Sequence, residues 1–367
     1  MDGTEVDHLP IKYVEYMEMY VGNARQAAYF LAKSFGFEPF AYRGLETGTR
    51  DRVSYALRQG QCVIVVTGAL TGNTDVGAFL TAHGDGVRDV AFAVSDVRSA
   101  YREAVARGAI PVMEPREETD EFGTVTHAVI GTYGDTVHSL IDREGYQGVL
   151  TPGFRPYQGG LKTTSAGLTQ FDHLVGNVEL GKMNDWVRYY QRALGFSQYI
   201  SFEDDDISTE YSALMSKVMQ NDSGRIKLPI NEPAVGRKKS QIQEYLDFFG
   251  GPGVQHIAIL THDIVATVEE LTARGVEFLK TPESYYQELR ERFGQLDEGI
   301  DNLERLSILV DQDEEGYLLQ IFTKPIVDRP TVFFEIIQRK GSRGFGKGNF
   351  RALFEAIERE QELRGNL

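Results

Sequence analysis

The sequence is poor in the residues and segments that mark several classes of protein. It has one cysteine, Cys62, in 367 residues, so no disulfide can form within the chain. Cys62 lies in an alternating apolar run, and we expect a buried structural thiol rather than a nucleophile. The chain has no stretch of about 18 apolar residues to span a bilayer, and its first residues lack the pattern of a signal peptide. We therefore expect a cytoplasmic protein without a membrane partner.

Basic residues are scarce relative to acidic ones. The chain has 38 Lys and Arg against 54 Asp and Glu, which gives a formal charge of −16. Because a nucleic-acid partner requires a basic face to neutralise phosphates, this charge argues against one. With 41% apolar and 11% aromatic residues, the sequence predicts well-packed globular domains. An enzyme that acts on a small molecule therefore fits this composition better than a nucleic-acid-binding protein does.

What the sequence does contain is an internal repeat. A chain of 367 residues suits two domains of ordinary size. Three pairs of segments resemble one another: residues 20–24 and 174–178, residues 84–91 and 251–258, and residues 137–143 and 333–339. Between the two halves, residues 151–169 are rich in proline and glycine and predict a linker.

Each half predicts a strand, a helix and several further strands, twice over. Helical spacing is clear at residues 24–35, 97–107 and 264–274, whereas residues 87–94, 137–142 and 306–310 predict strands. Four βαβββ units in two pairs give an α+β fold with two barrel-like domains, residues 1–150 and residues 170–367. A final amphipathic helix follows Gly348, and we expect it to cap the second barrel. Its apolar stripe consists of Phe350, Leu353, Phe354 and Ile357.

The second half carries three residues of metal-ligand type where the first half has none. The repeat aligns Met19 with His173, Asp89 with His256, and Ser139 with Glu335. Glu335 is the most specific of these residues, because it lies in a very apolar strand where a carboxylate must be paired or bind a metal. Two imidazoles and one carboxylate form the facial triad of non-haem Fe(II) oxygenases. The sequence therefore predicts one metal site, in the second domain.

Simpler roles must be weighed against this hypothesis. Taken singly, each histidine is more often a satisfied core or turn residue than a ligand. However, the first half lacks counterparts of His173, His256 and Glu335 all together, and this is hard to explain by packing alone. The remaining histidines have no such support, and we interpret them as structural or solvated. They are His8, His83, His127, His138 and His262. The glycine-rich residues 344–349 lack the strand and the Lys-Ser/Thr ending of a P-loop, and we expect them to form a turn.

Long segments of the chain resemble the 4-hydroxyphenylpyruvate dioxygenase family. The matching segments are residues 171–181, 228–233, 239–241, 253–258, 318–325, 330–337 and 344–350. The resemblance implies the vicinal oxygen chelate fold, with Fe(II) bound only in the C-terminal domain by His173, His256 and Glu335. It also implies that 4-hydroxyphenylpyruvate and dioxygen are converted to homogentisate and carbon dioxide in tyrosine catabolism. The keto acid is part of the substrate, so no separate 2-oxoglutarate is required.

The same resemblance implies roles for further residues. A polar set around the substrate corresponds to Ser216, Asn231, Gln241, Gln255 and Gln320. The substrate-binding positions correspond to Phe322, Phe333, Phe345, Asn349 and Phe350. Neutral amides can orient keto and phenol groups without competing for the metal. We further expect a homo-oligomer.

Three alternatives stay open at this point. Hydroxymandelate synthase shares the fold, the ligands and the substrate but oxidises the benzylic carbon. It has an aliphatic residue in place of Phe350 and lacks the equivalent of Asn231, so both positions favour the dioxygenase. A binding protein of the same fold would need no metal, and a metal assay would distinguish it. A glyoxalase-type isomerase would take ligands from both modules and ranks last.

Overall fold

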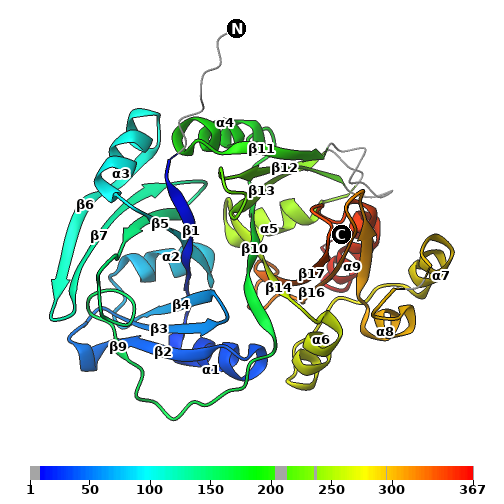
Figure 1. Ribbon diagram of the computed structural model, residues 1–367, viewed down its shortest axis with the longest axis horizontal. Helices are drawn as coiled ribbons and strands as arrows, with labels where there is room; N and C mark the ends of the chain where they lie inside the picture. Colours follow the sequence, from blue (N-terminus) through cyan, green and yellow to red (C-terminus); the bar gives the residue numbers. More distant parts are fainter. Residues whose placement is uncertain (1–8, 203–212, 235–237, 295, 367) are drawn as a thin grey trace, which may run out of the picture.

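The computed structural model describes residues 9–202, 213–234, 238–294 and 296–366, and His8 lies outside this part. The described residues form two curved mixed sheets that lie side by side (Figure 1). The first has the order β6-β7-β8-β5-β1-β4-β3-β2-β9, and the second has the order β11-β12-β13-β10-β14-β17-β16-β15. The strands of the first sheet are β1 (Ile11–Tyr20), β2 (Glu38–Arg43), β3 (Arg52–Gln59), β4 (Cys62–Ala69), β5 (Gly86–Val94), β6 (Ile110–Asp120), β7 (Gly123–Gly131), β8 (Val137–Asp142) and β9 (Arg155–Pro156). Those of the second are β10 (Leu168–Asn177), β11 (Ser197–Phe202), β12 (Ala213–Gln220), β13 (Lys227–Ala234), β14 (Gly253–Thr261), β15 (Leu309–Gln312), β16 (Tyr317–Phe322) and β17 (Phe333–Lys340).

Helices follow the first strand of each βαβββ unit. The helices in these positions are α1 (Ala24–Phe35), α3 (Val97–Ala106), α4 (Met183–Leu194) and α6 (Ile264–Ala273). The others are α2 (Asp75–His83), α5 (Gln241–Phe249), α7 (Glu283–Arg292), α8 (Ile300–Leu306) and α9 (Phe350–Leu363), with short 3₁₀ turns η1 (Leu45–Thr47) and η2 (Lys347–Asn349). The predicted fold of four paired βαβββ units with a terminal helix is thus confirmed. No helix of the described residues is long and apolar enough to cross a membrane.

Several elements differ from the prediction. The strand expected at residues 306–310 begins only at Leu309, because Leu306 ends α8. Helices α2, α5, α7 and α8 were not predicted. Strand β6 was also missed, because most of its side chains are exposed and polar at the edge of the sheet. The predicted linker contributes β9, which pairs with β2. We propose to keep residues 151–169 as the boundary between the two domains.

The two sheets are packed together through aromatic and histidine side chains. Phe35 of α1 contacts Phe334 of β17 edge to face, with ring centroids 4.9 Å apart. Nε2 of His138 in β8 lies 2.8 Å from the hydroxyl of Tyr190 in α4. Nδ1 of His83 in α2 donates at 2.7 Å to the carbonyl of Phe249 in α5. These two histidines are buried and structural, as their sequence positions predicted.

Strand register corrects one part of the repeat alignment. In the first sheet Tyr16 pairs with Ala91, whereas in the second His173 pairs with Ala258. Each of these two residues directly follows a register shift between β1 and β5 or between β10 and β14. The structural counterpart of His173 is therefore Tyr16, and the predicted counterpart, Met19, is wrong by three residues. The short similar segments around Val21 and Val175 caused this error, because β1 ends three residues earlier than the similarity suggests.

Candidate metal centre and its cavity

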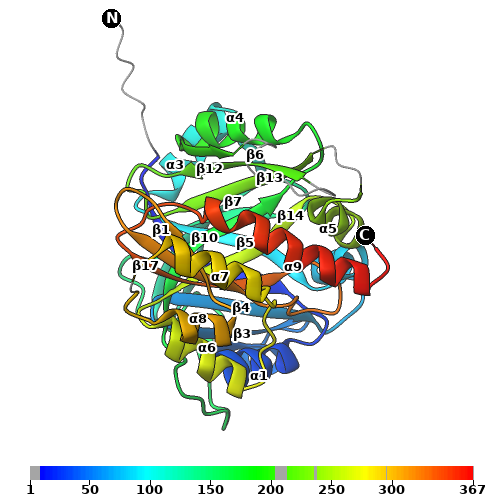
Figure 2. The same ribbon diagram turned by 90° about the vertical axis from the view of Figure 1, so that its right-hand side faces the viewer.

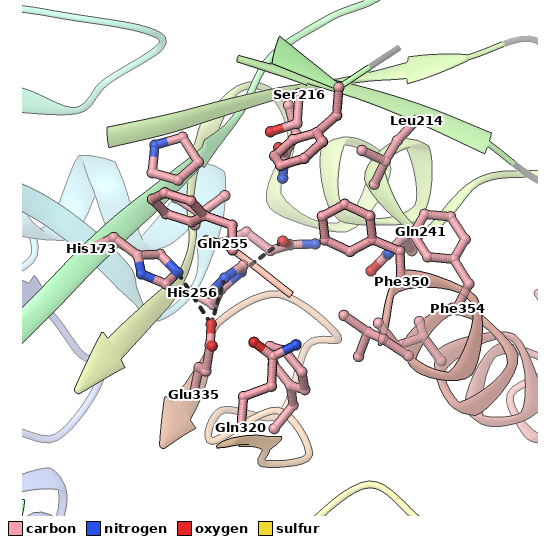
Figure 3. Close-up of a pocket in the computed structure, with 18 of the residues that line it drawn as sticks. His173, Leu214, Ser216, Gln241, Gln255, His256, Gln320, Glu335, Phe350 and Phe354 are labelled. Carbon is pink, nitrogen blue, oxygen red and sulfur yellow. Dashed lines mark hydrogen bonds and ion pairs between the residues drawn. The ribbon is translucent and has the colours of Figure 1, made fainter. Parts of the chain in front are cut away.

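The three predicted ligands lie on one face of three adjacent strands. His173 of β10 is opposite Ala258 of β14, and Ala258 is opposite Glu335 of β17. His256 is two residues before Ala258, so its side chain points to the same face. The nitrogen and oxygen atoms that the three side chains offer all lie within 4.8 Å of one another (Figure 3). Among the described residues, this is the one such group of at least three His, Cys, Asp or Glu side chains.

A β-bulge precedes each histidine. Phe171 and His173 pair with successive residues of β14, which leaves Asp172 as the extra residue on β10. Val175 and Gly176 are opposite His256 and Val254, which leaves Gln255 as the extra residue on β14. A bulge re-aims the side chains around it. Here it brings the residue before each histidine next to the imidazole that follows.

These bulge residues fix the imidazoles. Oδ2 of Asp172 lies 2.7 Å from Nδ1 of His173, and Oε1 of Gln255 lies 3.0 Å from Nδ1 of His256. Because both oxygens are acceptors, each neutral imidazole carries its proton on Nδ1 and leaves Nε2 as an acceptor. The two Nε2 atoms face Oε2 of Glu335, at 3.2 Å from His173 and 3.5 Å from His256. With both imidazoles neutral, three acceptors thus converge in a buried place.

A divalent cation would satisfy these acceptors. The carboxylate of Glu335 is almost completely buried. Burial by itself raises its pKa, but His173 and His256 outweigh burial and lower the pKa of Glu335 to about 2. Burial opposes the charged form of His173 as well, yet the carboxylates of Glu335 and Asp172 raise the pKa of His173 overall. An ionised carboxylate and two Nε2 lone pairs on one face are the donor set of a first-row metal with open positions. The residues present therefore fit a metal.

A cavity of about 80 Å³ opens above the three side chains. Strands β10, β11, β12, β13, β14, β16 and β17 line it on one side, and α5, α9 and the segment before α9 line it on the other. The apolar stripe of α9 faces this cavity, as predicted, with Phe350, Leu353, Phe354 and Ile357 in its wall. Figure 2 shows α9 lying across the open side of the second sheet. In Figure 3, Phe350 and Phe354 enter the cavity opposite Glu335.

The structure brings most of the predicted site residues into this wall. The amide and hydroxyl side chains that line it are Ser216, Asn231, Gln241, Gln255 and Gln320. The predicted phenylalanines Phe322, Phe333, Phe345 and Phe350 line it as well. Gly346 has φ +74° and lies against the amide of Gln320, where a Cβ atom would come within 2.3 Å of Nε2. A side chain at this position would displace Gln320 from the cavity.

Asn349 is the exception among the predicted residues. It is fully buried at the start of α9, but it does not belong to the cavity lining. Its Oδ1 accepts a hydrogen bond of 2.7 Å from the hydroxyl of Tyr285. The contact ties the start of α9 to α7, so Asn349 supports the wall from outside.

Sequence reasoning missed the residues that support the ligands from behind. Asp172 is almost completely buried and forms two hydrogen bonds of 2.7 Å with the guanidinium of Arg339. Although burial raises the pKa of this carboxyl, the hydrogen bonds from Arg339 and His173 hold the pKa far below its usual value. The available signal was the position of Asp172 directly before His173. The other missed wall residues are Val175, Phe202, Leu214, Val218 and Pro229.

In the first sheet, a hydrogen-bonded cluster occupies the equivalent place. Asp89 is the counterpart of His256, and both carboxylate oxygens accept hydrogen bonds from Ser139, the counterpart of Glu335, at 2.9 Å from its amide and 2.5 Å from its hydroxyl. Tyr16 lies beside them, and burial, with the nearby carboxylate of Asp89, raises its pKa well above the usual value. Donors from the protein thus satisfy Asp89, whereas in the second sheet the two Nε2 atoms and the carboxylate of Glu335 face one another.

The chain is similar to known proteins over nearly its whole length. The model of the Glyoxalase/Bleomycin resistance protein/Dioxygenase superfamily matches residues 12–143 and 170–321. A 4-hydroxyphenylpyruvate dioxygenase from Yarrowia lipolytica is 49% identical over 366 residues, which covers 96% of this chain and 93% of the relative. The dioxygenase of the same name from Caenorhabditis elegans is 50% identical over 364 residues, with 96% and 93% covered.

A solved structure is similar in fold over nearly the whole chain. A triple mutant of 4-hydroxymandelate synthase from Streptomyces coelicolor superimposes with a TM-score of 0.88 at 36% identity, covering 96% of this chain and 100% of that chain. The curated relatives are the more similar in sequence. The chain therefore belongs to the 4-hydroxyphenylpyruvate dioxygenase family, within the Glyoxalase/Bleomycin resistance protein/Dioxygenase superfamily.

Proposed function

We propose that this chain is an Fe(II)-dependent dioxygenase that converts 4-hydroxyphenylpyruvate and dioxygen to homogentisate and carbon dioxide. The observation that carries the proposal is the buried set of His173, His256 and Glu335, whose three acceptor atoms converge below a cavity with aromatic and amide walls. The relatives of nearly 50% identity have this activity in their names. The overall reaction balances: one oxygen atom enters the new carboxylate, the other enters the ring hydroxyl, and the original carboxylate leaves as carbon dioxide.

His173, His256 and Glu335 would hold the metal. When bound, Fe(II) supplies the polarisation of the 2-oxo acid and the electrons that activate dioxygen. Asp172 and Gln255 keep the two imidazoles in the tautomer and orientation that such binding requires. Because Oε1 of Gln255 is occupied by His256, we assign Gln255 a positioning role besides any contact with substrate through its amide nitrogen.

The remaining wall residues suit an aromatic keto acid. Phe333 is stacked on His256, with ring centroids 4.9 Å apart, and Phe322 is opposite Glu335 on the neighbouring strand. These rings form an apolar surface for the substrate ring near the metal. Ser216 and Asn231 are opposite each other on β12 and β13, and with Gln241 they can donate to the phenol oxygen or the carboxylate of the substrate. None of these side chains brings a competing charge.

Substrate entry requires movement of the wall. The cavity of about 80 Å³ is smaller than the roughly 150 Å³ cavity that takes up a single benzene. Helix α9 is the wall element that follows the last strand, and polar contacts attach its C-terminal end to the body, among them an ion pair of 3.2 Å between Glu360 and Lys324. Gln361 donates to the carbonyl of Lys239 at 3.5 Å, and Arg364 pairs with Glu244 of α5 at 2.8 Å. We assign α9 the role of a lid that opens for substrate and then excludes water.

Product analysis tests this function. Purified protein is loaded with Fe(II), supplied with 4-hydroxyphenylpyruvate and air, and the products are separated by chromatography. We expect homogentisate and carbon dioxide in equal amounts, with one dioxygen consumed for each. Absence of turnover by protein that holds one iron per chain would contradict the proposal.

The second candidate is hydroxymandelate synthase, because a protein of that name shares the fold over the whole chain. Phe350 bears on this choice: it lines the cavity and contacts Phe202 edge to face, with centroids 5.0 Å apart. An aromatic residue here restricts the space beside the substrate and favours attack on the ring. The same chromatogram distinguishes the two reactions, since hydroxymandelate as the main product would support the second candidate.

A further inference from the structure

Asp172 and Arg339 connect the candidate metal centre with the segment that leads into α9. Asp172 accepts two hydrogen bonds of 2.7 Å from Nε and Nη2 of Arg339 and a third of 2.7 Å from Nδ1 of His173. Its side chain is 3% exposed, and that of Arg339 is 15% exposed. A forked pair of this kind fixes both partners in one geometry.

The third nitrogen of the Arg339 guanidinium, Nη1, binds the segment that follows β17. Nη1 of Arg339 donates to the carbonyl of Gly344 at 2.7 Å and to that of Ser342 at 3.3 Å. We call residues 342–346 the lid loop, because they join β17 to η2 and α9. Phe345 of this loop lies under the guanidinium at 5.7 Å and contacts the ring of His173 edge to face at 5.0 Å. Arg339 thus reaches the lid loop and, through Asp172, the candidate ligand.

A buried network of this kind favours all-or-none behaviour. Displacing the lid loop would leave two donors of a largely buried cation without acceptors, and rotating Asp172 would leave His173 without its partner. The state in which all of these hydrogen bonds are formed is therefore favoured over states in which only some of them are formed. A ligand that holds His173 in place therefore also favours the ordered lid loop. By linkage, ordering of the lid loop favours binding of that ligand at His173.

We propose that Asp172 and Arg339 are positioning residues that couple metal binding at His173 to ordering of the lid loop. This inference rests on the metal site of the proposed function. Arg339 does not belong to the ligand set or to the cavity lining. It acts through Asp172 on the metal centre and through two carbonyls on the lid loop.

Hydrogen exchange with and without Fe(II), under anaerobic conditions, tests the coupling without any turnover. In wild-type protein we expect Fe(II) to slow exchange of the amides of residues 342–349 about fivefold or more. In Arg339→Gln this metal-dependent slowing should disappear, and Fe(II) should bind about tenfold more weakly although no ligand has changed. Asp172→Asn keeps an acceptor oxygen but loses the charge, and we expect about 10–100-fold weaker binding with the same loss of slowing.

Asp313 provides a matched control. Its Oδ2 accepts hydrogen bonds from the same lid loop, at 2.5 Å from the hydroxyl of Ser342 and 2.9 Å from the amide of Gly344. It has no contact with the candidate ligands among its hydrogen bonds. Asp313→Asn should speed exchange of the lid loop in the metal-free protein, yet keep the slowing by Fe(II) and the metal affinity of the wild type.

The outcomes separate the two claims. If wild-type protein binds no Fe(II), or binds it equally well without Glu335, the proposed metal site is wrong. If wild-type protein binds Fe(II) but Arg339→Gln retains both the affinity and the metal-dependent slowing, the coupling alone is wrong. Equal effects of Asp313→Asn and Arg339→Gln would also overturn it, since they would show general loosening of the loop.

Discussion

Tyr16 and His173 occupy equivalent positions in the two sheets, each directly after a bulge and each opposite an alanine of the neighbouring strand. The same topology therefore presents a phenol in one sheet and an imidazole in the other. In the first sheet, the donors of Ser139 satisfy Asp89. In the second, acceptors from His173, His256 and Glu335 converge. This difference is the physical basis on which we propose a metal site in only one half.

Replacing Glu335 with Gln should remove metal binding while preserving the fold. The amide is nearly isosteric but has no anionic charge, and loss of a partner outside the ligand set already costs about 10–100-fold in metal affinity. We therefore expect Fe(II) affinity and turnover to fall by more than about 100-fold. Isothermal titration and product assays measure the two effects. A variant with wild-type iron content and activity would show that Glu335 is not a ligand.

Changes in the first sheet should not alter metal content. Tyr16→Phe, Asp89→Asn and Ser139→Ala affect the counterparts of the three proposed ligands. Elemental analysis should give one iron per chain for the wild type and for each variant. The same measurement on Met19→Ala serves as a control, because register does not place this residue at the equivalent position. A stoichiometry of two, reduced to one by Asp89→Asn, would contradict the asymmetric site.

Asp89 should make stability depend on pH near neutrality. Burial raises the pKa of Asp89 to about 7, Glu18 adds to the rise, and hydrogen bonds from Ser139 oppose it. Because the folded-state pKa lies above the unfolded value, the proton on Asp89 stabilises the fold at low pH, and this contribution is lost as pH rises through 7. Between pH 6 and pH 8 the loss is on the order of 1 kcal/mol.

Denaturant unfolding at both pH values measures this effect. Asp89→Asn keeps the shape of the side chain and cannot ionise, so its free energy of unfolding should change less over the same interval. Glu18 has a raised pKa for the same reason of burial, so some dependence should persist in the variant. Identical pH dependence in wild type and Asp89→Asn would show that Asp89 does not titrate in this range.

Removal of α9 should uncouple the reaction. A chain that ends at Asn349 keeps Phe345 and the proposed ligands but lacks the stripe that closes the cavity. We expect a folded protein that binds iron, with homogentisate yield reduced at least about tenfold relative to dioxygen consumption, since water reaches the reacting centre. An oxygen electrode combined with chromatography measures both quantities. Wild-type yield would mean that α9 only completes the core.

Phe350→Ile tests the wall of the cavity more finely. The substitution removes the ring that contacts Phe202 and lines the cavity, so the substrate ring is held less firmly. We expect a lower homogentisate yield and some hydroxymandelate. Leu353→Ile, also in the stripe, is the matched control and should retain the product ratio. The same ratio in both variants and the wild type would remove Phe350 from product selection.

Much of the fold could be predicted from the sequence, because its signals are local. Helix α1 begins and ends where the apolar spacing predicts, at Ala24 and Phe35. Helix α7 was missed because its sequence is largely polar and its helical position depends on packing of Tyr286 and Leu289 in the core. The apolar stripe of α9 can be recognised in the sequence by its helical spacing. The surface that the stripe covers, however, is formed by strands from the whole second sheet.

The sequence by itself determined that Glu335 needs a partner, because a carboxylate in so apolar a strand cannot remain unpaired, and that two halves share one architecture. Only the tertiary structure decided which residues meet. The register between β10 and β14 is set by hydrogen bonds between residues about 80 positions apart in the chain, and a single extra residue shifts every later pair. The similar segments around Val21 and Val175 do not reveal this register, and for this reason they aligned Met19 with His173. The pair of Asp172 and Arg339, 167 residues apart in sequence, exists only because the curved sheet brings β10 and β17 to the two sides of β14.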